Sequence, residues 1–176
     1  MVELRAKLAA DRPRMVEVQG RLELPFERRQ KTRQRAHLVS GEEVAVLLPR
    51  GESMRGGDLL EASDGRVIEV VAEAEHLLHV ACASPDALSR CAYHLGNRHA
   101  PVQVGDGWLR LAFDHVLRDM LVGLGATVTE VEAGFEPEPG AYGAVHAHAV
   151  EVRTSRIHDF ADRPGSTPVP TRTAPA

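Results

Sequence analysis

The hydrophobic pattern of the chain changes at Ser84, and this change restricts the folds that the chain can adopt. Before Ser84 the sequence contains no helical periodicity of useful length. Short alternating or compact apolar runs occur there instead, and turn residues such as Ser63-Asp64-Gly65 separate them. After Ser84 the patterns of strands and helices alternate. We therefore expect an α+β protein whose N-terminal domain, residues 1–74, is rich in β-structure.

Five apolar runs of the first half predict β-strands. They span residues 15–18, 21–24, 43–48, 59–62 and 66–71. Short strands with turn signals between them are typical of a small sandwich or barrel-like domain. The basic run at residues 28–35 lies among these strands. We interpret it first as a solvated face and second as a docking surface for an acidic protein.

The second half predicts the order β-α-β-β-α-β, which is that of a ferredoxin-like domain, and we place this domain at residues 75–150. Ser84 is the expected N-cap of the first helix, which the pair Gly96-Asn97 should end as a left-handed stop. Asp114 is the expected N-cap of the second helix. The expected strands span residues 76–81, 102–104, 108–111 and 127–131, and the core-facing residues of the second helix should be Val116, Leu117, Met120, Leu121 and Leu124.

Composition narrows the functional classes. Hydrophobic residues make up 43% of the 176 residues, which is enough for a core. The net charge of −4 argues against nucleic-acid binding by the whole protein. No run approaches the roughly 18 apolar residues of a membrane helix, and the N-terminus lacks a signal-peptide core, so we expect a cytoplasmic protein. Residues 151–176 have little apolar surface to bury, and we expect them to be disordered.

Histidines carry the most specific chemical signal. His94 and His99 lie on either side of a Gly-Asn pair, and His115 follows sixteen residues after His99. Imidazole is a common protein ligand for zinc, copper and nickel. Each histidine also has a structural explanation: His94 in a last helical turn, His99 on the surface, and His115 at a helix start. The two cysteines, Cys82 and Cys91, are expected to be reduced and to pack as small hydrophobic residues.

Four ordered blocks of sequence resemble the UreE-type urease accessory proteins, which are nickel metallochaperones. The first block runs from Leu47-Leu48-Pro49-Arg50-Gly51 to Asp58, and the second is Tyr93 through Val104, which contains His-Leu-Gly-Asn-Arg-His. The third is Asp114-His115-Val116-Leu117 with the helix that follows, and the fourth begins at Phe135-Glu136-Pro137-Glu138. The resemblance covers roughly residues 15 to 148, and four blocks in order are far more specific than any single short motif.

This resemblance implies a non-enzymatic, homodimeric carrier that delivers Ni(II) to urease apoprotein. The implied partners are urease apoprotein and the other urease accessory proteins, including the accessory GTPase, with no nucleic acid and no membrane. In the family, the histidine that matches His99 is the main metal ligand at the dimer interface. The histidine that matches His115 is linked to a secondary site, although here Phe113 replaces the partner histidine found in some relatives. Zn(II) or Cu(II) can occupy such imidazole sites in vitro.

A dimer can supply more of the ligands that a metal ion needs than a single chain can. Nickel and zinc take roughly four or more ligands, so one imidazole cannot hold them alone. A two-fold contact places a residue beside its own copy, and His99 then supplies two ligands. His146 and His148 can add more, because alternate residues of an extended segment project to one side.

Two other functions remain open from the residues alone. A metal-dependent hydrolase could use His94, His99 and His115, but the sequence contains neither HExxH nor GxSxG. A peptide-binding chaperone module could be built on the β-rich domain. His37, His76 and His79 lie outside every matching block, and we interpret them as structural.

Overall fold

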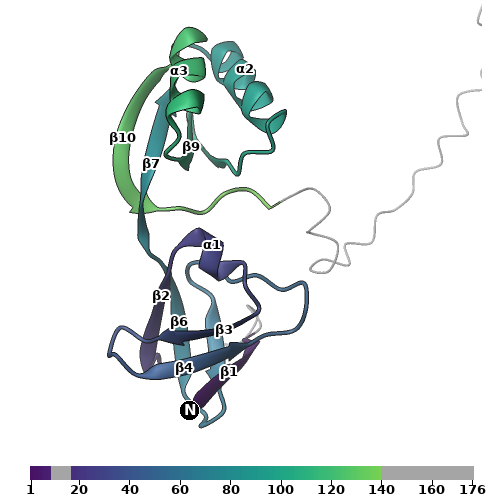
Figure 1. Cartoon of the computed structure of the whole chain (residues 1–176), viewed down its shortest axis with the longest axis vertical. Coiled ribbons are helices and arrows are strands. Elements are labelled where there is room, and N and C mark those ends of the chain that lie inside the picture. The colour runs from purple at the N-terminus through teal and green to yellow at the C-terminus, as the bar shows by residue number, and fades with distance from the viewer. Residues whose placement is uncertain (9–16, 140–176) are drawn as a thin grey trace, which may run out of the picture. The chain divides into compact units, whose positions relative to one another are not determined.

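Two separate β-sheets organise the part of the chain that the computed structural model describes, residues 1–8 and 17–139 (Figure 1). The first sheet has six strands in the order β2-β6-β5-β1-β4-β3. Their bounds are Val2–Lys7 for β1, Gly20–Leu24 for β2, Arg33–His37 for β3, Glu43–Leu47 for β4, Leu59–Ala62 for β5 and Val67–Ala72 for β6. A short helix, α1 (Phe26–Arg29), connects β2 to β3.

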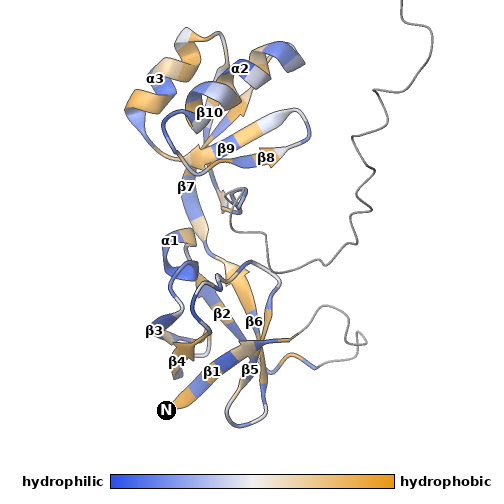
Figure 2. Cartoon of the chain, turned by 90° about the vertical axis from the view of Figure 1, so that its right-hand side faces the viewer, coloured by the Kyte–Doolittle hydropathy of each residue, from blue (hydrophilic) through white to orange (hydrophobic). Residues whose placement is uncertain are grey.

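The six-stranded sheet curls toward closure, as a barrel-like domain should. Val39, just after β3, donates its backbone N–H to the carbonyl of Arg21 in β2 at 2.9 Å, although these strands are at opposite edges of the sheet. Hydrophobic and hydrophilic residues alternate along the strands (Figure 2). The inward residues form a fully buried aliphatic core that includes Leu4, Leu22, Val44, Val46, Leu60, Ile68 and Val70.

The second sheet has four antiparallel strands in the order β10-β7-β9-β8. The strands are β7 (Ala74–Ala81), β8 (Gln103–Gly105), β9 (Trp108–Ala112) and β10 (Thr127–Gly134). Helix α2 (Pro85–Gly96) follows β7, and helix α3 (His115–Gly123) follows β9. The two helices pack on one face of this sheet through a second core, which contains Leu78, Val80, Cys91, Leu95, Leu109, Leu111 and Leu121. The α+β class and the ferredoxin-like β-α-β-β-α-β order are therefore confirmed.

Both expected helix starts are present. The Ser84 hydroxyl accepts a hydrogen bond from the backbone N–H of Ala87 at 3.2 Å. The Asp114 carboxylate accepts from the N–H groups of Val116 and Leu117 at 2.8 and 2.9 Å. The expectation that Val116 faces the core is wrong, because its side chain is 61% exposed on the first turn of α3, whereas Leu121 is fully buried.

The first domain differs from the sequence expectations at four places. Strand β3 includes the end of the basic run and was not among the five expected strands. The strand expected at residues 15–18 is not found: Glu17 and Val18 lie outside any strand, and Met15 and Val16 lie outside the described residues. Strand β1 was not expected, although its alternating apolar residues fit one face of a sheet. The four residues of α1 are too few to show a helical period.

No helix of the described residues is long and apolar enough to cross a membrane.

A fully buried arginine secures the chain that follows β10. The Arg29 guanidinium donates to the carbonyls of Leu24 and Phe135 and to the carboxylate of Glu136, the last at 2.5 Å. The Phe135 ring meets the edge of Phe26 at a centroid distance of 5.4 Å. A buried charge is tolerated only when it is paired and hydrogen-bonded, and all three nitrogens of this guanidinium have partners.

Replacing this arginine should destabilise the fold markedly. We predict that Arg29→Ala lowers the free energy of unfolding by about 3 kcal/mol, because it removes the donor of the Phe135 carbonyl and the cation of the Glu136 carboxylate and leaves the Leu24 carbonyl with the Glu73 N–H as its donor. Arg21→Ala is the matched control: its ion pair with Glu69 is exposed, with the Arg21 side chain 67% accessible, and should be worth less than about 1 kcal/mol. Urea unfolding of both variants measures the difference, and equal losses would contradict the role assigned to Arg29.

Candidate metal centre

The chain leaves α2 through a left-handed residue, and that residue is His99. Its φ is +53°, the one positive φ outside glycine in the described residues. The backbone N–H of His99 donates to the carbonyl of Gly96 at 2.9 Å, and that of Ala100 donates to Leu95 at 3.3 Å. The left-handed region costs a non-glycine residue roughly 1–2 kcal/mol. Strained backbone of this kind is concentrated at functional positions, so His99 is a candidate site residue.

The left-handed stop expected at Gly96-Asn97 is wrong. Gly96 is the last residue of α2, and Asn97 has a right-handed φ of −62°. The helical hydrogen bonds instead extend beyond the helix, since Asn97 donates to Tyr93 and Arg98 donates to Leu95, each at 3.0 Å. The chain therefore adopts the left-handed backbone conformation at His99 and not at Gly96 or Asn97. The sequence gives no signal for this, because glycine and asparagine are the usual left-handed residues and both precede it.

The neighbours of His99 leave it accessible. Its side chain is exposed, as are those of Asn97 and Arg98. Tyr93, on the last turns of α2, is 66% exposed. His94 is half-buried in the last turn of α2, where a cation favours the helix dipole, and its ring meets the edge of Tyr93 at a centroid distance of 5.5 Å.

His115 occupies a different place, at the first position of α3 behind the Asp114 cap. It is also exposed. The neighbouring Phe113 ring stacks on the ring of His76 at a centroid distance of 4.5 Å and an interplanar angle of 8°. Phe113 therefore packs against His76 and supplies no metal ligand beside His115.

The remaining histidines of the described chain have partners or lie apart from this region. His76 contacts the Glu130 carboxylate at 2.9 Å, and His79 accepts a hydrogen bond from Arg110 at 3.3 Å. His37 is exposed on β3 of the first sheet. These contacts agree with structural roles for His76 and His79.

Residues 1–8 and 17–139 contain no group of three histidine, cysteine or acidic side chains that could hold a metal ion. His94, His99 and His115 therefore do not form one centre, and the hydrolase that would use all three has no support from this arrangement. His146 and His148 lie outside the described residues. An ion at His99 needs further ligands from there, from water or from a second copy of the chain.

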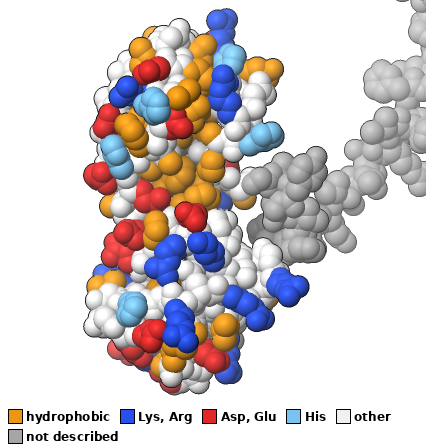
Figure 3. Space-filling view, in the orientation of Figure 1, with side chains coloured by type: hydrophobic (Ala, Val, Ile, Leu, Met, Phe, Trp, Pro, Cys, Tyr) orange, Lys and Arg blue, Asp and Glu red, His pale blue; other side chains and the backbone are white. Residues whose placement is uncertain are grey.

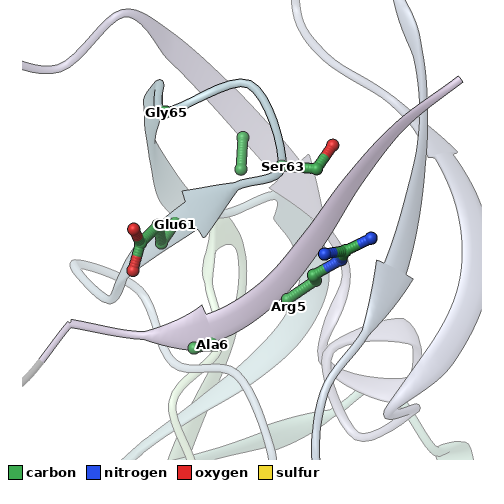
Figure 4. Close-up of a pocket in the computed structure, with 6 residues that line it drawn as sticks. Arg5, Ala6, Glu61, Ser63 and Gly65 are labelled. Carbon is green, nitrogen blue, oxygen red and sulfur yellow. The ribbon is translucent and has the colours of Figure 1, made fainter.

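A pocket of about 340 Å³ lies in the first domain, beside the bulge where β1 pairs with β5 (Figure 4). Its lining includes Arg5, Glu61 and Ser63 but no histidine or cysteine. The pocket therefore adds no residue to the candidate metal ligands. Peptide binding by this domain stays a prediction.

Comparisons with known proteins cover both domains. Residues 5–73 match the family model of the UreE urease accessory protein N-terminal domain, and residues 75–161 match that of its C-terminal domain. The chain belongs to the UreE family of urease accessory proteins. The resemblance found in the sequence is thus confirmed, and the family name is that of an accessory protein.

Several UreE relatives are similar over most of their length. A urease accessory protein UreE of Nitrosospira multiformis is 52% identical over 142 residues, which are 80% of this chain and 81% of the relative. One of Ectopseudomonas mendocina is 56% identical over 126 residues, 71% of this chain and 76% of the relative. A urease accessory protein UreE 2 of Pseudomonas syringae pv. syringae is 54% identical over 129 residues, 73% of this chain and 78% of the relative.

The strain at His99 predicts opposite effects for the same substitution at two neighbouring histidines. His99→Gly should raise the free energy of unfolding of the metal-free protein by about 1 kcal/mol, because glycine adopts positive φ without steric cost. His94→Gly should lower it by about 1 kcal/mol, because glycine is unfavourable within a helix. Urea unfolding checks both values. A comparable loss of stability in the two variants would mean that His99 is not strained.

Proposed function

We propose that this protein is a nickel-binding metallochaperone that delivers Ni(II) to urease apoprotein during assembly of the urease active site. The observation that carries the proposal is the geometry of His99 within a UreE fold. Its exposed imidazole stands on a strained turn fixed by the end of α2. Strain at a residue with no buried packing of its own suggests a purpose other than stability.

A homodimer completes the site in this proposal. One His99 supplies one ligand, and nickel takes roughly four or more. An isologous contact brings the two His99 residues of a dimer together near the symmetry axis. An apolar side chain close to His99 in the chain, Tyr93 on the last turns of α2, is 66% exposed and is available for such a contact. Hydrophobic and histidine side chains occur together on the face of this domain that Figure 3 shows.

An exposed site suits a carrier. The ion can be passed on because few protein groups need to move when it leaves, whereas a resident cofactor is usually enclosed. His115 is proposed as a weaker second site, and His146 and His148 as additional ligands. Imidazole also binds Zn(II) and Cu(II), so these ions should compete in vitro.

The proposed partners are urease apoprotein and the other urease accessory proteins, including the accessory GTPase. The names of the relatives, all urease accessory proteins, support this assignment. The mild net charge of −4 gives no support to a nucleic-acid partner. We propose that the protein acts in the cytoplasm.

Nickel titration of single variants tests the assignment. We predict that His99→Ala removes the tightest nickel site and leaves the thermal unfolding midpoint within a few degrees, because an exposed side chain contributes little packing. His115→Ala should weaken binding less. His37→Ala is the matched control, since His37 is also exposed but lies on β3. Calorimetry on the metal-free proteins measures all three. Loss of the tight site in His115→Ala but not in His99→Ala would reverse the assignment.

A truncation tests the contribution of His146 and His148. Ending the chain after Tyr142 should lower the nickel stoichiometry or affinity, because both imidazoles are removed, while the dimer persists in size-exclusion chromatography. The double variant His146→Ala/His148→Ala separates the effect of these side chains from that of chain length. An unchanged isotherm for both proteins would mean that neither histidine is a ligand.

A further inference from the structure

Two thiols that the metal centre does not use face each other beneath α2. Cys82 lies one residue after the end of β7, and Cys91 lies in the middle of α2. Both are free, and their Sγ atoms are 3.8 Å apart. Cys91 is fully buried in the second core, whereas Cys82 is half-buried at its edge.

We propose that Cys82 and Cys91 are a redox-sensitive pair that closes to an intramolecular disulfide when a peroxide oxidises Cys82. The pair is then a protective modification site. Its product can be reduced again by a thiol, whereas oxidation of an isolated cysteine continues to sulfinic and sulfonic acids.

The geometry allows this closure with a local movement. A disulfide has an S–S length of about 2.05 Å, so the two sulfur atoms must approach by about 1.8 Å from their separation of 3.8 Å. A rotation of the Cys82 side chain and a small shift of its backbone can supply this movement. Cys82 belongs to the short connection between β7 and α2, outside both elements, so no strand hydrogen bond has to break.

The different environments of the two thiols set the order of the steps. Cys82 is the thiol that a dissolved oxidant reaches first, because it is the more exposed of the two. Burial raises the pKa of Cys91 to about 11, with smaller contributions from the Cys82 hydrogen bond and charge. A raised pKa keeps Cys91 protonated at neutral pH, and the thiol form is a poor nucleophile toward peroxide. Cys91 is therefore not the first thiol to be oxidised. It serves as the resolving thiol because its sulfur lies 3.8 Å from that of Cys82 and can pass its proton to the leaving hydroxyl as it attacks.

The reaction balances without any group beyond the peroxide. The Cys82 thiolate attacks one peroxide oxygen, the O–O bond breaks, and Cys82 becomes a sulfenic acid while the other oxygen leaves as water after protonation. The Cys91 sulfur then attacks the Cys82 sulfur, the S–O bond breaks, and a second water leaves with the Cys91 proton. Two thiols lose two electrons in total, and one hydrogen peroxide is reduced to two waters.

Arg90 makes the product simple to detect. Trypsin cleaves after this residue, so Cys82 and Cys91 fall into separate peptides, residues 67–90 and 91–98. The full-length reduced protein is treated with a small excess of hydrogen peroxide at neutral pH and is then alkylated under denaturing conditions. We expect an intact mass lower by two hydrogens, no alkylated cysteine, and the two peptides joined until a thiol reductant is added. Non-reducing electrophoresis should show no disulfide-linked dimer.

Single variants separate a resolving pair from two independent thiols. In Cys91→Ala the same treatment should drive Cys82 to sulfinic and sulfonic acids, which a thiol does not reduce. In Cys82→Ala most of Cys91 should stay available for alkylation, because it is buried. Circular dichroism confirms folding, and if Cys91→Ala does not fold, the linked peptides of the wild-type protein decide alone. Wild-type protein that keeps both thiols, links two chains, or over-oxidises Cys82 overturns the proposal.

Discussion

The arrangement of the described chain depends on the hydrogen bonds and the ion pair that the buried Arg29 guanidinium makes. A charge without solvent needs a partner for each of its donors, and Arg29 finds them at the end of β2 and in the segment that follows β10. Glu136 extends this network, since its carboxylate also accepts from the backbone N–H of Gly56 at 2.7 Å. Residues separated by more than a hundred positions are thereby fixed together, and the segment after β10 has a defined course up to the point where the described chain ends.

His99 differs from Arg29 in that it lies on the surface and is not held by buried side-chain partners. Its side chain is exposed, its backbone has an unfavourable φ, and two hydrogen bonds of the helix end hold it there. Cys91 and Leu95 pack in the second core and hold α2 against the sheet. The helix therefore ends at a fixed point, and His99 follows from there. A chaperone that must both bind and release an ion benefits from a ligand that is positioned by the fold but is not enclosed by it.

Much of the fold can be predicted from the sequence, because local chemistry and global packing agree. Ser84 and Asp114 cap their helices as their side chains predict, and the order of the second domain follows from alternating patterns. Strand β1 also has a usable signal, since its apolar residues alternate. The left-handed backbone of His99 has no such signal, because Gly96 and Asn97, the residue types that usually adopt it, come before His99 in the chain. The proposed metal site rests on the resemblance more than on geometry, because the described residues of one chain contain no group of three potential metal ligands.

In the proposed nickel site, two His99 residues from different subunits share one ion. Mixed dimers test it most directly: wild-type and His99→Ala chains with different affinity tags are co-expressed, and dimers carrying both tags are isolated and titrated with nickel. We predict one tight site per wild-type dimer and none in the mixed dimer, because one imidazole of the pair is missing. A mixed dimer that binds one ion at the wild-type affinity would contradict the shared site, since a single His99 would then hold nickel within its own subunit.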